Sequence, residues 1–516
     1  MTVKVFLPES ITNQSIRDLI DRWAFAQPDR PFLIAPETGE TITFEELRDS
    51  SRAFAGHLWA RDLPAGCSIA YAMNNGLMAA QVILGTLYGG YLATAVNLVS
   101  GKSTIAHVLS HSDARAVFVD EKSCTLIREV QAETGNTAQQ HFADSDWFTP
   151  SAASPPSCEP DSDGLLMYTS GTTGVPKGVV HTHASLLSGG ANTAFAHELT
   201  TSDRGLCVLP LYHINAFCVS LMGALASGSS LALPTRFSVS TFWSQVRDHE
   251  CSWFSVVPTQ ISYLLHDAQT HGHDSSGLSA LRFGRSASAP LSPDVQQAFE
   301  KQFRVPIIET MGLTETAAQI LSNPMTGERK VGSPGIAYGN EVMIADENQR
   351  ECARGTEGEV LVRGGNVMRL YRNNEDATRS TITPDGWLRT GDLGRMDDDG
   401  FVFITGRLKE LIIKGGENIA PREIDDALYA HPDVIEAAAF ARDCDRYGQT
   451  VEAAVVVTSE SILDERALIR LCEDAIGTFK APDCVHFFAE LPKGPSGKIQ
   501  RLKLVELTAA STKKSA

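Results

Sequence analysis

Basic side chains are few in this sequence compared with acidic ones. Its 516 residues include 44 Lys and Arg against 62 Asp and Glu, which gives a formal net charge of −18. This charge repels nucleic acid and anionic lipid, so neither is expected as a main partner. The ten cysteines include no CxxC pair, which argues against a zinc site. Scattered thiols are typical of reduced core residues, and with the lack of a signal-peptide segment they predict a cytoplasmic protein.

One stretch without charge, at residues 76–99, is long enough to cross a bilayer. Three glycines interrupt it, at Gly85, Gly89 and Gly90, and polar side chains also occur within it. This composition favours a buried helix, a turn and a buried strand over a membrane span. No membrane span is therefore expected.

Segments with helical and strand-like patterns alternate along most of the chain. Amphipathic stretches at residues 239–249 and 294–303 are each followed by an apolar, strand-like run. Such alternation is typical of α/β domains, in which helices cover parallel or mixed sheets. Because a single core stops growing at ~250–300 residues, this length predicts at least two domains.

The pattern changes in the last third of the chain. After about Gly355, short strand-like runs bounded by turn residues predict a small antiparallel β region. The strands and helices that follow suffice for a small α+β domain of roughly 110 residues. We predict an N-terminal domain at residues 1–406 and a C-terminal domain at residues 410–516, joined by residues 407–409. The final stretch, residues 509–516, is expected to be disordered.

A segment rich in glycine and hydroxyl groups, LMYTSGTTGVPKGVVHTH, begins at Leu166. Glycines let the backbone approach a ligand closely, and successive N–H groups can form a nest for an anion. The hydroxyls and Lys177 favour phosphate binding over the alternative, a plain mobile loop. The segment is not a P-loop, because Lys177 is followed by Gly178 rather than by Ser or Thr. A P-loop kinase or GTPase is therefore disfavoured.

Three other segments combine glycine with polar residues. In ETMGLTET, which ends an apolar strand, Glu315 either binds Mg²⁺ or caps a helix. In GWLRTGDLG, Asp392 is placed in a tight turn between strands, where a lone Asp is usually a turn residue. In PKGPSGKIQR, Lys498 lies in a glycine-rich loop, where a lone Lys is usually solvated. None of these segments is specific when taken alone.

Taken together, the segments resemble one family. YTSGTTGVPKG, MGLTE, TGD, GRLKELIIKGGENIAPREI and PKGPSGKIQR stand in the order and spacing of the AMP-forming acyl-CoA synthetase superfamily, which includes firefly luciferase and peptide-synthetase adenylation domains. The resemblance extends from about residue 15 to about residue 505. It implies an acid–thiol ligase that converts a carboxylic acid and ATP into an acyl-adenylate. Coenzyme A then displaces AMP to give a thioester.

The resemblance also implies which residues hold ATP and Mg²⁺. Thr314 would contact the α-phosphate, Glu315 would bind Mg²⁺, and Asp392 would accept from the ribose hydroxyls. Arg407 would assist Asp392. The β- and γ-phosphates would bind the loop residues Thr169, Ser170, Gly171, Thr172, Thr173 and Lys177. The walls around the adenine would be formed by Ser288, Ala289, Pro290, Glu309, Thr310, Met311 and Gly312.

Further residues match the parts of the family that change between the two half-reactions. Lys498 resembles the lysine that bridges the carboxylate and the α-phosphate during adenylation. Lys409 falls at the hinge, residues 407–409, about which the small domain rotates after the first half-reaction. Gly415 and Gly416 would then line the tunnel for the pantetheine arm of CoA. The alternative for the two glycines is a simple turn.

The identity of the acid is less clear from the sequence. No Asp follows LPLYHINAF, so α-amino acids are disfavoured, and no carrier-protein segment is present. The region 205–340 most resembles oxalyl-CoA synthetases, and Arg285, Ser286 and His213, beside Asn215, could hold a second polar end of the acid. Arg285 could instead be structural, and His213 could be a gate.

One position departs from the oxalyl-CoA synthetase pattern. Ala318 stands where that group typically has His, which removes a donor and widens the pocket. A small polar or short-chain acid, such as an oxalate-like, hydroxylated or dicarboxylic acid, is therefore expected.

Several rival functions remain open at this point. A stand-alone adenylating enzyme that loads a carrier protein would use the same motifs, as would a ligase for medium-chain or aromatic acids. A non-catalytic adenylate sensor is disfavoured because the hinge and the adenylating lysine are both retained. The expected ligands are ATP, Mg²⁺, coenzyme A and a carboxylic acid, and a homodimer is left open.

Overall fold

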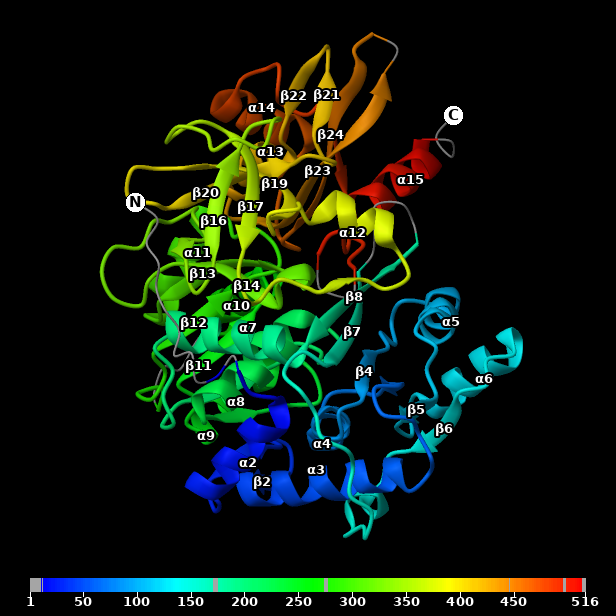
Figure 1. Cartoon of the computed structure of the whole chain (residues 1–516). Helices are drawn as coiled ribbons and strands as arrows, with labels where there is room; N and C mark the ends of the chain where they lie inside the picture. Colours follow the sequence, from blue (N-terminus) through cyan, green and yellow to red (C-terminus); the bar gives the residue numbers. More distant parts are fainter. Residues whose placement is uncertain are drawn as a thin grey trace.

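The computed structural model describes residues 11, 13–169, 175–272, 277–444, 446–494 and 498–512. Figure 1 shows a large part built from most of the chain and a smaller part above it formed by the C-terminal residues. The two are in contact through several elements, and the candidate site lies where they meet.

The largest sheet lies at the centre of the large part. Its strand order is β15-β14-β13-β12-β11-β9-β10-β1-β2, and the strands from β13 to β1 run parallel. The strands are β1 (Pro31–Ile34), β2 (Thr41–Thr43), β9 (Arg204–Cys207), β10 (Ser230–Ala232), β11 (Trp253–Val256), β12 (Phe283–Ser286), β13 (Ile307–Leu313), β14 (Ala318–Ser322) and β15 (Ile336–Ala337). The parallel strands are buried on both faces, which explains their continuous apolar runs.

A second sheet packs beside the first and has the order β18-β8-β7-β4-β3-β5-β6. Its strands are β3 (Ser68–Ala72), β4 (Leu92–Ala95), β5 (Ala116–Val119), β6 (Gln139–Phe142), β7 (Asp163–Thr169), β8 (Lys177–Thr182) and β18 (Leu370–Tyr371). β7 pairs in parallel with β4 but antiparallel with β8. The glycine-rich segment therefore joins two neighbouring strands as a hairpin.

Helices cover both sheets. They are α2 (Ile16–Ala26), α3 (Phe44–Trp59), α4 (Leu77–Tyr88), α5 (Lys102–His111), α6 (Cys124–Thr134), η1 (Ser145–Phe148), α7 (His183–Ala196), η2 (Asn215–Met222), α8 (Gly223–Ser227), α9 (Val239–Asp248), α10 (Pro258–His271), α11 (Pro293–Phe303), η3 (Thr314–Thr316) and α12 (Glu375–Thr381). The start of α3 is fixed by a capping box, in which Thr43 and Glu46 satisfy each other's backbone N–H groups.

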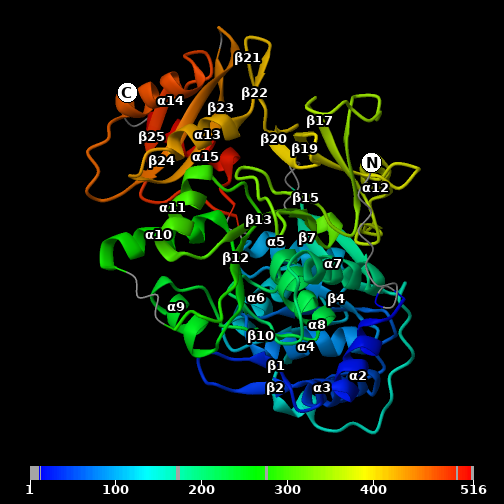
Figure 2. The ribbon, with the colours of Figure 1, turned by 90° about the vertical axis from the view of Figure 1, so that its left-hand side faces the viewer.

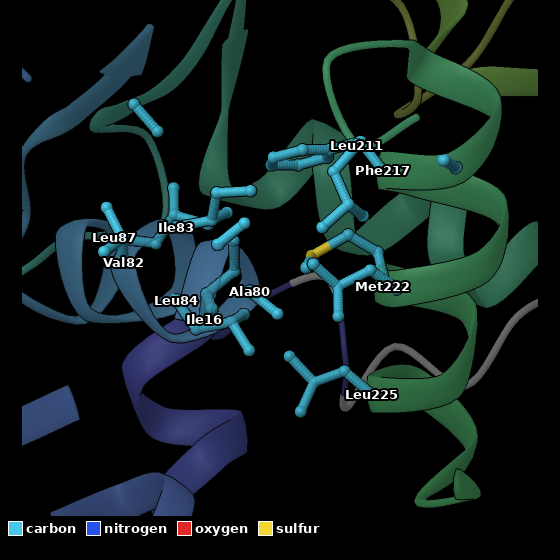
Figure 3. Packing of buried hydrophobic residues seen from close by; sticks show 14 of the residues in the cluster. Ile16, Ala80, Val82, Ile83, Leu84, Leu87, Leu211, Phe217, Met222 and Leu225 are labelled. Carbon is cyan, nitrogen blue, oxygen red and sulfur yellow. The ribbon is translucent and has the colours of Figure 1, made fainter. Parts of the chain in front are cut away.

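The uncharged stretch at residues 76–99 forms α4, a turn and β4, as predicted. α4 is buried almost all round, and Figure 3 shows Ile83 and Leu84 of this helix facing the segment that carries Phe217 and Met222. Within the part of the chain that the structure describes, no helix is both long and apolar enough to span a membrane.

The C-terminal third contains two further sheets. The first has the order β16-β17-β19-β20 and comprises β16 (Glu341–Ala345), β17 (Gly358–Arg363), β19 (Leu388–Met396) and β20 (Val402–Arg407). All its pairs are antiparallel, as predicted for the region after Gly355. Asp392, however, lies within β19 and not in a turn. Gly391 adopts a left-handed φ of 73° there, so a turn-like sequence is accommodated inside a bulged strand.

The smaller part is an α+β unit with its own core. Its sheet is formed by β21 (Ile412–Lys414), β22 (Glu417–Ile419), β23 (Val434–Cys444), β24 (Gly448–Val457) and β25 (Cys484–Phe487). The helices are α13 (Pro421–Tyr429), α14 (Glu465–Ile476) and α15 (Arg501–Thr512). Figure 2 shows this unit above α10 and α11. Its two apolar clusters contain residues from 412 onward.

The structure confirms the predicted fold class but not the predicted disorder at the C-terminal end. The fold class is confirmed: mixed sheets covered by helices are followed by a small antiparallel region and a small α+β unit. Disorder at residues 509–512 is wrong, because these residues continue α15, which is anchored by the buried Leu504 and Thr508. The boundary at residues 407–409 stays a prediction.

Candidate active site

The β7–β8 hairpin places the glycine-rich segment at the edge of the candidate site. Thr169 and Lys177 are paired across the hairpin, at the last positions of β7 and the first of β8. The Lys177 ammonium lies over the Tyr371 ring, 4.8 Å from its centroid. Ser170, Gly171, Thr172 and Thr173 lie outside the described residues. The hairpin base therefore directs at least one cation toward the strand that carries Tyr371.

Glu315 lies beside this hairpin and is held by Tyr371. The Tyr371 hydroxyl donates to Glu315 Oε1 over 2.7 Å, and the Met368 N–H donates to the Glu315 carbonyl over 2.7 Å. Burial, and then the Glu315 charge, raises the pKa of Tyr371, so this tyrosine remains a donor. A fixed carboxylate next to a cationic hairpin is suited to a metal–phosphate complex.

The carboxylates around Glu315 determine how Mg²⁺ could bind. Among the described residues, no group of three or more His, Cys, Asp and Glu side chains could enclose a metal ion. Mg²⁺ at nucleotide sites is commonly held by one or two carboxylates together with phosphate oxygens and water. Glu315 fits that arrangement, in which ATP supplies the remaining ligands.

Thr314 is positioned by a buried histidine on the hairpin. His181 Nε2 lies 2.6 Å from the Thr314 carbonyl oxygen, and since a carbonyl only accepts, Nε2 carries the proton. Burial lowers the pKa of His181 to about 4. The neighbouring His183 accepts from the Ile16 N–H at Nδ1, and burial also lowers its pKa to about 4. Both side chains are therefore neutral at neutral pH.

These two histidines predict a loss of stability in mild acid. Because the unfolded chain has a histidine pKa of about 6.5, it binds more protons than the folded protein at every pH between that value and about 4. The free energy of unfolding should thus decrease as the pH is lowered through this window, by about 1.4 kcal/mol per pH unit for each histidine. Urea unfolding at pH 7, 6 and 5 measures the slope. His181→Gln should flatten it, and an unchanged slope in this variant contradicts the assignment.

Asp392, Arg407 and Lys498 form a second charged group near Glu315. Arg407 Nε lies 2.7 Å from Asp392 Oδ1, across the β19–β20 pair. Burial raises the pKa of Asp392, while the charges of Arg407 and Lys498 lower it. Lys498 retains solvent exposure but is crowded by protein, and this crowding, followed by the Arg407 charge, lowers its pKa.

The charges that act on Lys498 locate it in the site. Besides Asp392, the carboxylates of Glu410 and Glu315 are near enough to raise its pKa and so partly oppose the crowding. Lys498 belongs to the smaller part of the molecule, whereas Glu315 and Asp392 belong to the larger part. The orientation of the two parts therefore brings the lysine to the same site as the metal-binding candidate.

The residues predicted to surround the adenine lie at the ends of β12 and β13. Ser288 has a left-handed φ of 75°, and its hydroxyl accepts from Asn215 Nδ2 over 3.3 Å. Glu309 is buried and accepts from the Leu291 N–H at Oε1, and burial raises its pKa. Among the other members of this set, Thr310 is buried and Pro290 is exposed, and three are partly exposed: Ala289, Met311 and Gly312.

Two predicted elements are not brought to this site. Gly415 and Gly416 form the turn between β21 and β22 with φ values of 60° and 88°, and Figures 1 and 2 both show this hairpin at the far end of the smaller part. Lys409 is exposed just after β20. The roles of these three residues in CoA binding and domain rotation stay predictions.

Arg285 lies in a buried polar cluster behind the site. Only 1% of its surface is exposed. Its Nη1 donates to Asn215 Oδ1 over 3.0 Å and to Ser255 Oγ over 3.2 Å, and its Nη2 donates to Gln319 Oε1 over 3.3 Å. Among the described residues, no carboxylate lies within ion-pair distance of the guanidinium, and its Nε has no hydrogen-bond partner. Burial lowers the pKa of Arg285 to about 9, so it still carries its charge at pH 7.

The residues next to Arg285 are also buried and polar. The hydroxyl of Ser286, the next residue on β12, has no hydrogen-bond partner within the described part of the chain, and the Gln319 side chain contacts the buried His197 ring. Asn215 begins η2, a π-helical turn of the kind often found at functional sites. Ala318, at φ 72°, is buried at the start of β14, next to Gln319. The cluster therefore presents hydrogen-bond donors without an acceptor of matching charge.

Comparison with known proteins identifies the family of this chain. The model of the family described as AMP-binding enzyme matches residues 20–372, and that of its C-terminal domain matches residues 423–498. The chain belongs to the AMP-binding enzyme family. The resemblance to AMP-forming acyl-CoA synthetases is thereby confirmed.

Relatives of this AMP-binding enzyme match it over most of their length. A sulfoacetate–CoA ligase from Cupriavidus necator is 43% identical over 93% of this chain and 95% of its own. An oxalate–CoA ligase from Arabidopsis thaliana is 34% identical over 82% and 83%. The crystal structure of ATP-bound MatB from Rhodopseudomonas palustris has a TM-score of 0.86 and 27% identity, and covers 96% of this chain and 99% of that one.

The sequence motifs did not reveal several residues that build the site of this AMP-binding enzyme. Tyr371 holds Glu315, His181 holds Thr314, and Ser255 and Gln319 surround Arg285. These residues come from separate strands. A weak signal existed only for His181, which lies near the end of the glycine-rich segment.

Proposed function

We propose that this CoA ligase activates a small carboxylic acid that bears a second anionic group. The observation that carries the proposal is the buried Arg285, whose charge meets only neutral partners among the described residues. The reaction uses ATP to form an acyl-adenylate and pyrophosphate, and coenzyme A then displaces AMP.

Burial of the Arg285 charge carries an energetic cost. Removing an ion from water costs several kcal/mol, roughly, unless an opposite charge or hydrogen bonds compensate for it. Asn215, Ser255 and Gln319 supply dipoles but no negative charge. An anionic group of the substrate would supply both the missing charge and an acceptor for the unpartnered donors. The cluster is thus better suited to a second anion than to an apolar chain end.

The relatives support the same class of acid. Sulfoacetate and oxalate, which the two ligases above are named for, each combine the reacting carboxylate with another anionic group. Ala318 next to Gln319 favours an acid somewhat larger than oxalate, because its methyl group leaves space where a bulkier side chain would fill it. His213 precedes Asn215 in the chain by two residues and is retained as a gate or a ligand.

Each of the other site residues has a role in adenylation under this proposal. The Lys177 hairpin would hold the β- and γ-phosphates. Glu315 would hold Mg²⁺, and the bound ion would neutralise part of the phosphate charge. Asp392, oriented by Arg407, would accept from the ribose. Lys498 would stabilise the negative charge that gathers between the carboxylate and the α-phosphate. The reaction needs positioned cations rather than a side-chain nucleophile.

A panel of acids tests the proposal against its rivals. Pyrophosphate release is measured with and without CoA for oxalate, sulfoacetate, malonate, succinate, glycolate, hexanoate and benzoate. We expect pyrophosphate release with a small dianionic acid. Continued turnover to AMP should require CoA. Turnover only with hexanoate or benzoate contradicts the proposal. Adenylate formation without CoA-dependent turnover would instead support an enzyme that loads a carrier protein. No pyrophosphate release with any acid would support a non-catalytic adenylate sensor.

Three coarser proposals accompany this function. The domain boundary at residues 407–409 is supported by the separate apolar cores from residue 412 onward. A cytoplasmic location is supported by the ten cysteines, which are all free thiols. A homodimer is kept as a prediction that light scattering would test.

A further inference from the structure

A three-residue cluster connects the two parts of the molecule away from the nucleotide site. Tyr263, on α10 of the larger part, donates its hydroxyl to Glu436 Oε1 over 2.9 Å. Lys493 Nζ lies 2.7 Å from the same oxygen and donates to the Tyr263 hydroxyl over 2.9 Å. Glu436 lies on β23 and is only 1% exposed. The cluster is therefore a partly buried contact made by one residue of the larger part and two of the smaller part.

The same cluster is joined to the segment that carries Lys498. Glu436 Oε2 accepts from the Leu491 N–H over 3.4 Å. Lys493 pairs with Ile499 in an antiparallel bridge, and the Gly494 N–H donates to the Lys498 carbonyl over 2.6 Å. Lys493 and Lys498 thus lie on two chain segments that are hydrogen-bonded to each other. A shift of Lys493 would be passed to Lys498 through backbone hydrogen bonds.

The charged members of the cluster both belong to the smaller part, so a domain rotation would break only the hydrogen bonds to Tyr263. The ion pair between Lys493 and Glu436 lies within the smaller part and would move as a unit. Only the Tyr263 hydroxyl would be left behind. Because this donor is neutral, its withdrawal strands no buried charge in the larger part, in contrast to the breaking of an ion pair. The contact can therefore hold one orientation and still be released.

We propose that Tyr263 is a positioning residue for the adenylation half-reaction. Its hydroxyl fixes the Glu436–Lys493 pair against α10 and so holds the loop of Lys498 over the site formed by Glu315 and Asp392. The contact belongs to this orientation alone, since any rotation that withdraws Lys498 also withdraws Glu436 and Lys493.

A second contact keeps the parts together when Tyr263 is changed. Arg422 Nη1 donates to the Ile404 carbonyl over 2.7 Å, and Nη2 donates to the Gly332 carbonyl over 3.4 Å. Beside it, a cleft of about 400 Å³ is lined by both parts. Loss of the Tyr263 hydroxyl should consequently shift the orientation rather than separate the two parts.

Tyr263→Phe tests the proposal with a change of one atom. We expect the rate of acyl-adenylate formation, followed as pyrophosphate release in a single turnover, to fall about tenfold, the usual scale for a hydrogen bond to a charged group. Thioester formation from added acyl-adenylate and CoA should be unchanged or faster. Tyr91→Phe is the matched control, because its hydroxyl donates to the Leu63 carbonyl within the larger part. It should leave both half-reactions unchanged.

Two results would overturn the proposal. One is an equal fall in both half-reactions of Tyr263→Phe, which would indicate a general structural role. The other is an unchanged adenylation rate. The test uses whichever acid supports pyrophosphate release, so a failure of the dianion proposal would not affect it. Thermal unfolding of both variants confirms that they are folded.

Discussion

Lys498→Ala is expected to slow acyl-adenylate formation about a thousandfold, the upper scale for removing one electrostatic donor from a transition state. The reason is its place in the site: Lys498 lies within reach of the charges of Asp392 and Glu315, on a loop of the smaller part. The first half-reaction gathers negative charge between the carboxylate and the α-phosphate, and this lysine would stabilise it. Acid-dependent exchange of pyrophosphate into ATP measures the loss.

The second half-reaction provides the internal comparison for Lys498→Ala. Thioester formation from added acyl-adenylate should stay close to that of the unchanged enzyme, because no new phosphate charge develops in that step. Lys503→Ala, at an exposed position on α15, is the control and should behave as wild type in both assays. Undiminished exchange in Lys498→Ala would refute the assignment, as would an equal loss in both half-reactions.

Arg285→Met is expected to lower kcat/KM for a dianionic acid by about 30- to 1000-fold, which corresponds to losing one partner of a buried, hydrogen-bonded charge pair. The stability of the protein without ligand should not fall. Replacement of a buried charge by an apolar side chain of similar volume is often neutral, or stabilising by about 1–4 kcal/mol. Activity and stability should therefore change in opposite directions or independently. Steady-state kinetics and urea unfolding measure the two effects.

Arg282 offers a matched control three residues away. Its Nη1 lies 2.6 Å from Asp203 Oδ1, and the Asp203 side chain is only 4% exposed. Arg282→Met leaves this carboxylate buried without its partner, so it should lose stability but keep the preference for dianions. If Arg285→Met instead unfolds the protein and leaves the acid preference unchanged in the folded fraction, Arg285 is structural.

The contrast between these two arginines also shows where sequence reasoning ends. Both belong to one short stretch, LRFGRSAS, and nothing local distinguishes them. Asp203, which pairs with Arg282, comes from the turn before β9, whereas the partners of Arg285 come from η2, β11 and β14. Only the strand order of the sheet determines which arginine meets a carboxylate. The sequence could therefore propose Arg285 for the acid but could not separate this role from a structural one.

Local signals predicted elements well where they were complete. The uncharged stretch at residues 76–99 was correctly predicted to form a helix, a turn and a strand, and Gly89 caps the end of α4. Asp392 was wrongly predicted to lie in a turn because Gly391 has the left-handed φ that turns use, although here it lies within a bulged strand. Tyr371 and Tyr263 could not be predicted, since each acts through a residue more than fifty positions away in the chain.

The selectivity between matched acids tests the account most directly. Pairs of equal chain length, such as malonate with propionate and succinate with butyrate, differ only in whether the far end is anionic. If Arg285 receives the second anionic group, kcat/KM for the best dianion should exceed that of its monoanionic partner by about a hundredfold or more, since a buried charge pair is gained. Equal or greater kcat/KM for the monoanions would show that Arg285 does not receive the acid.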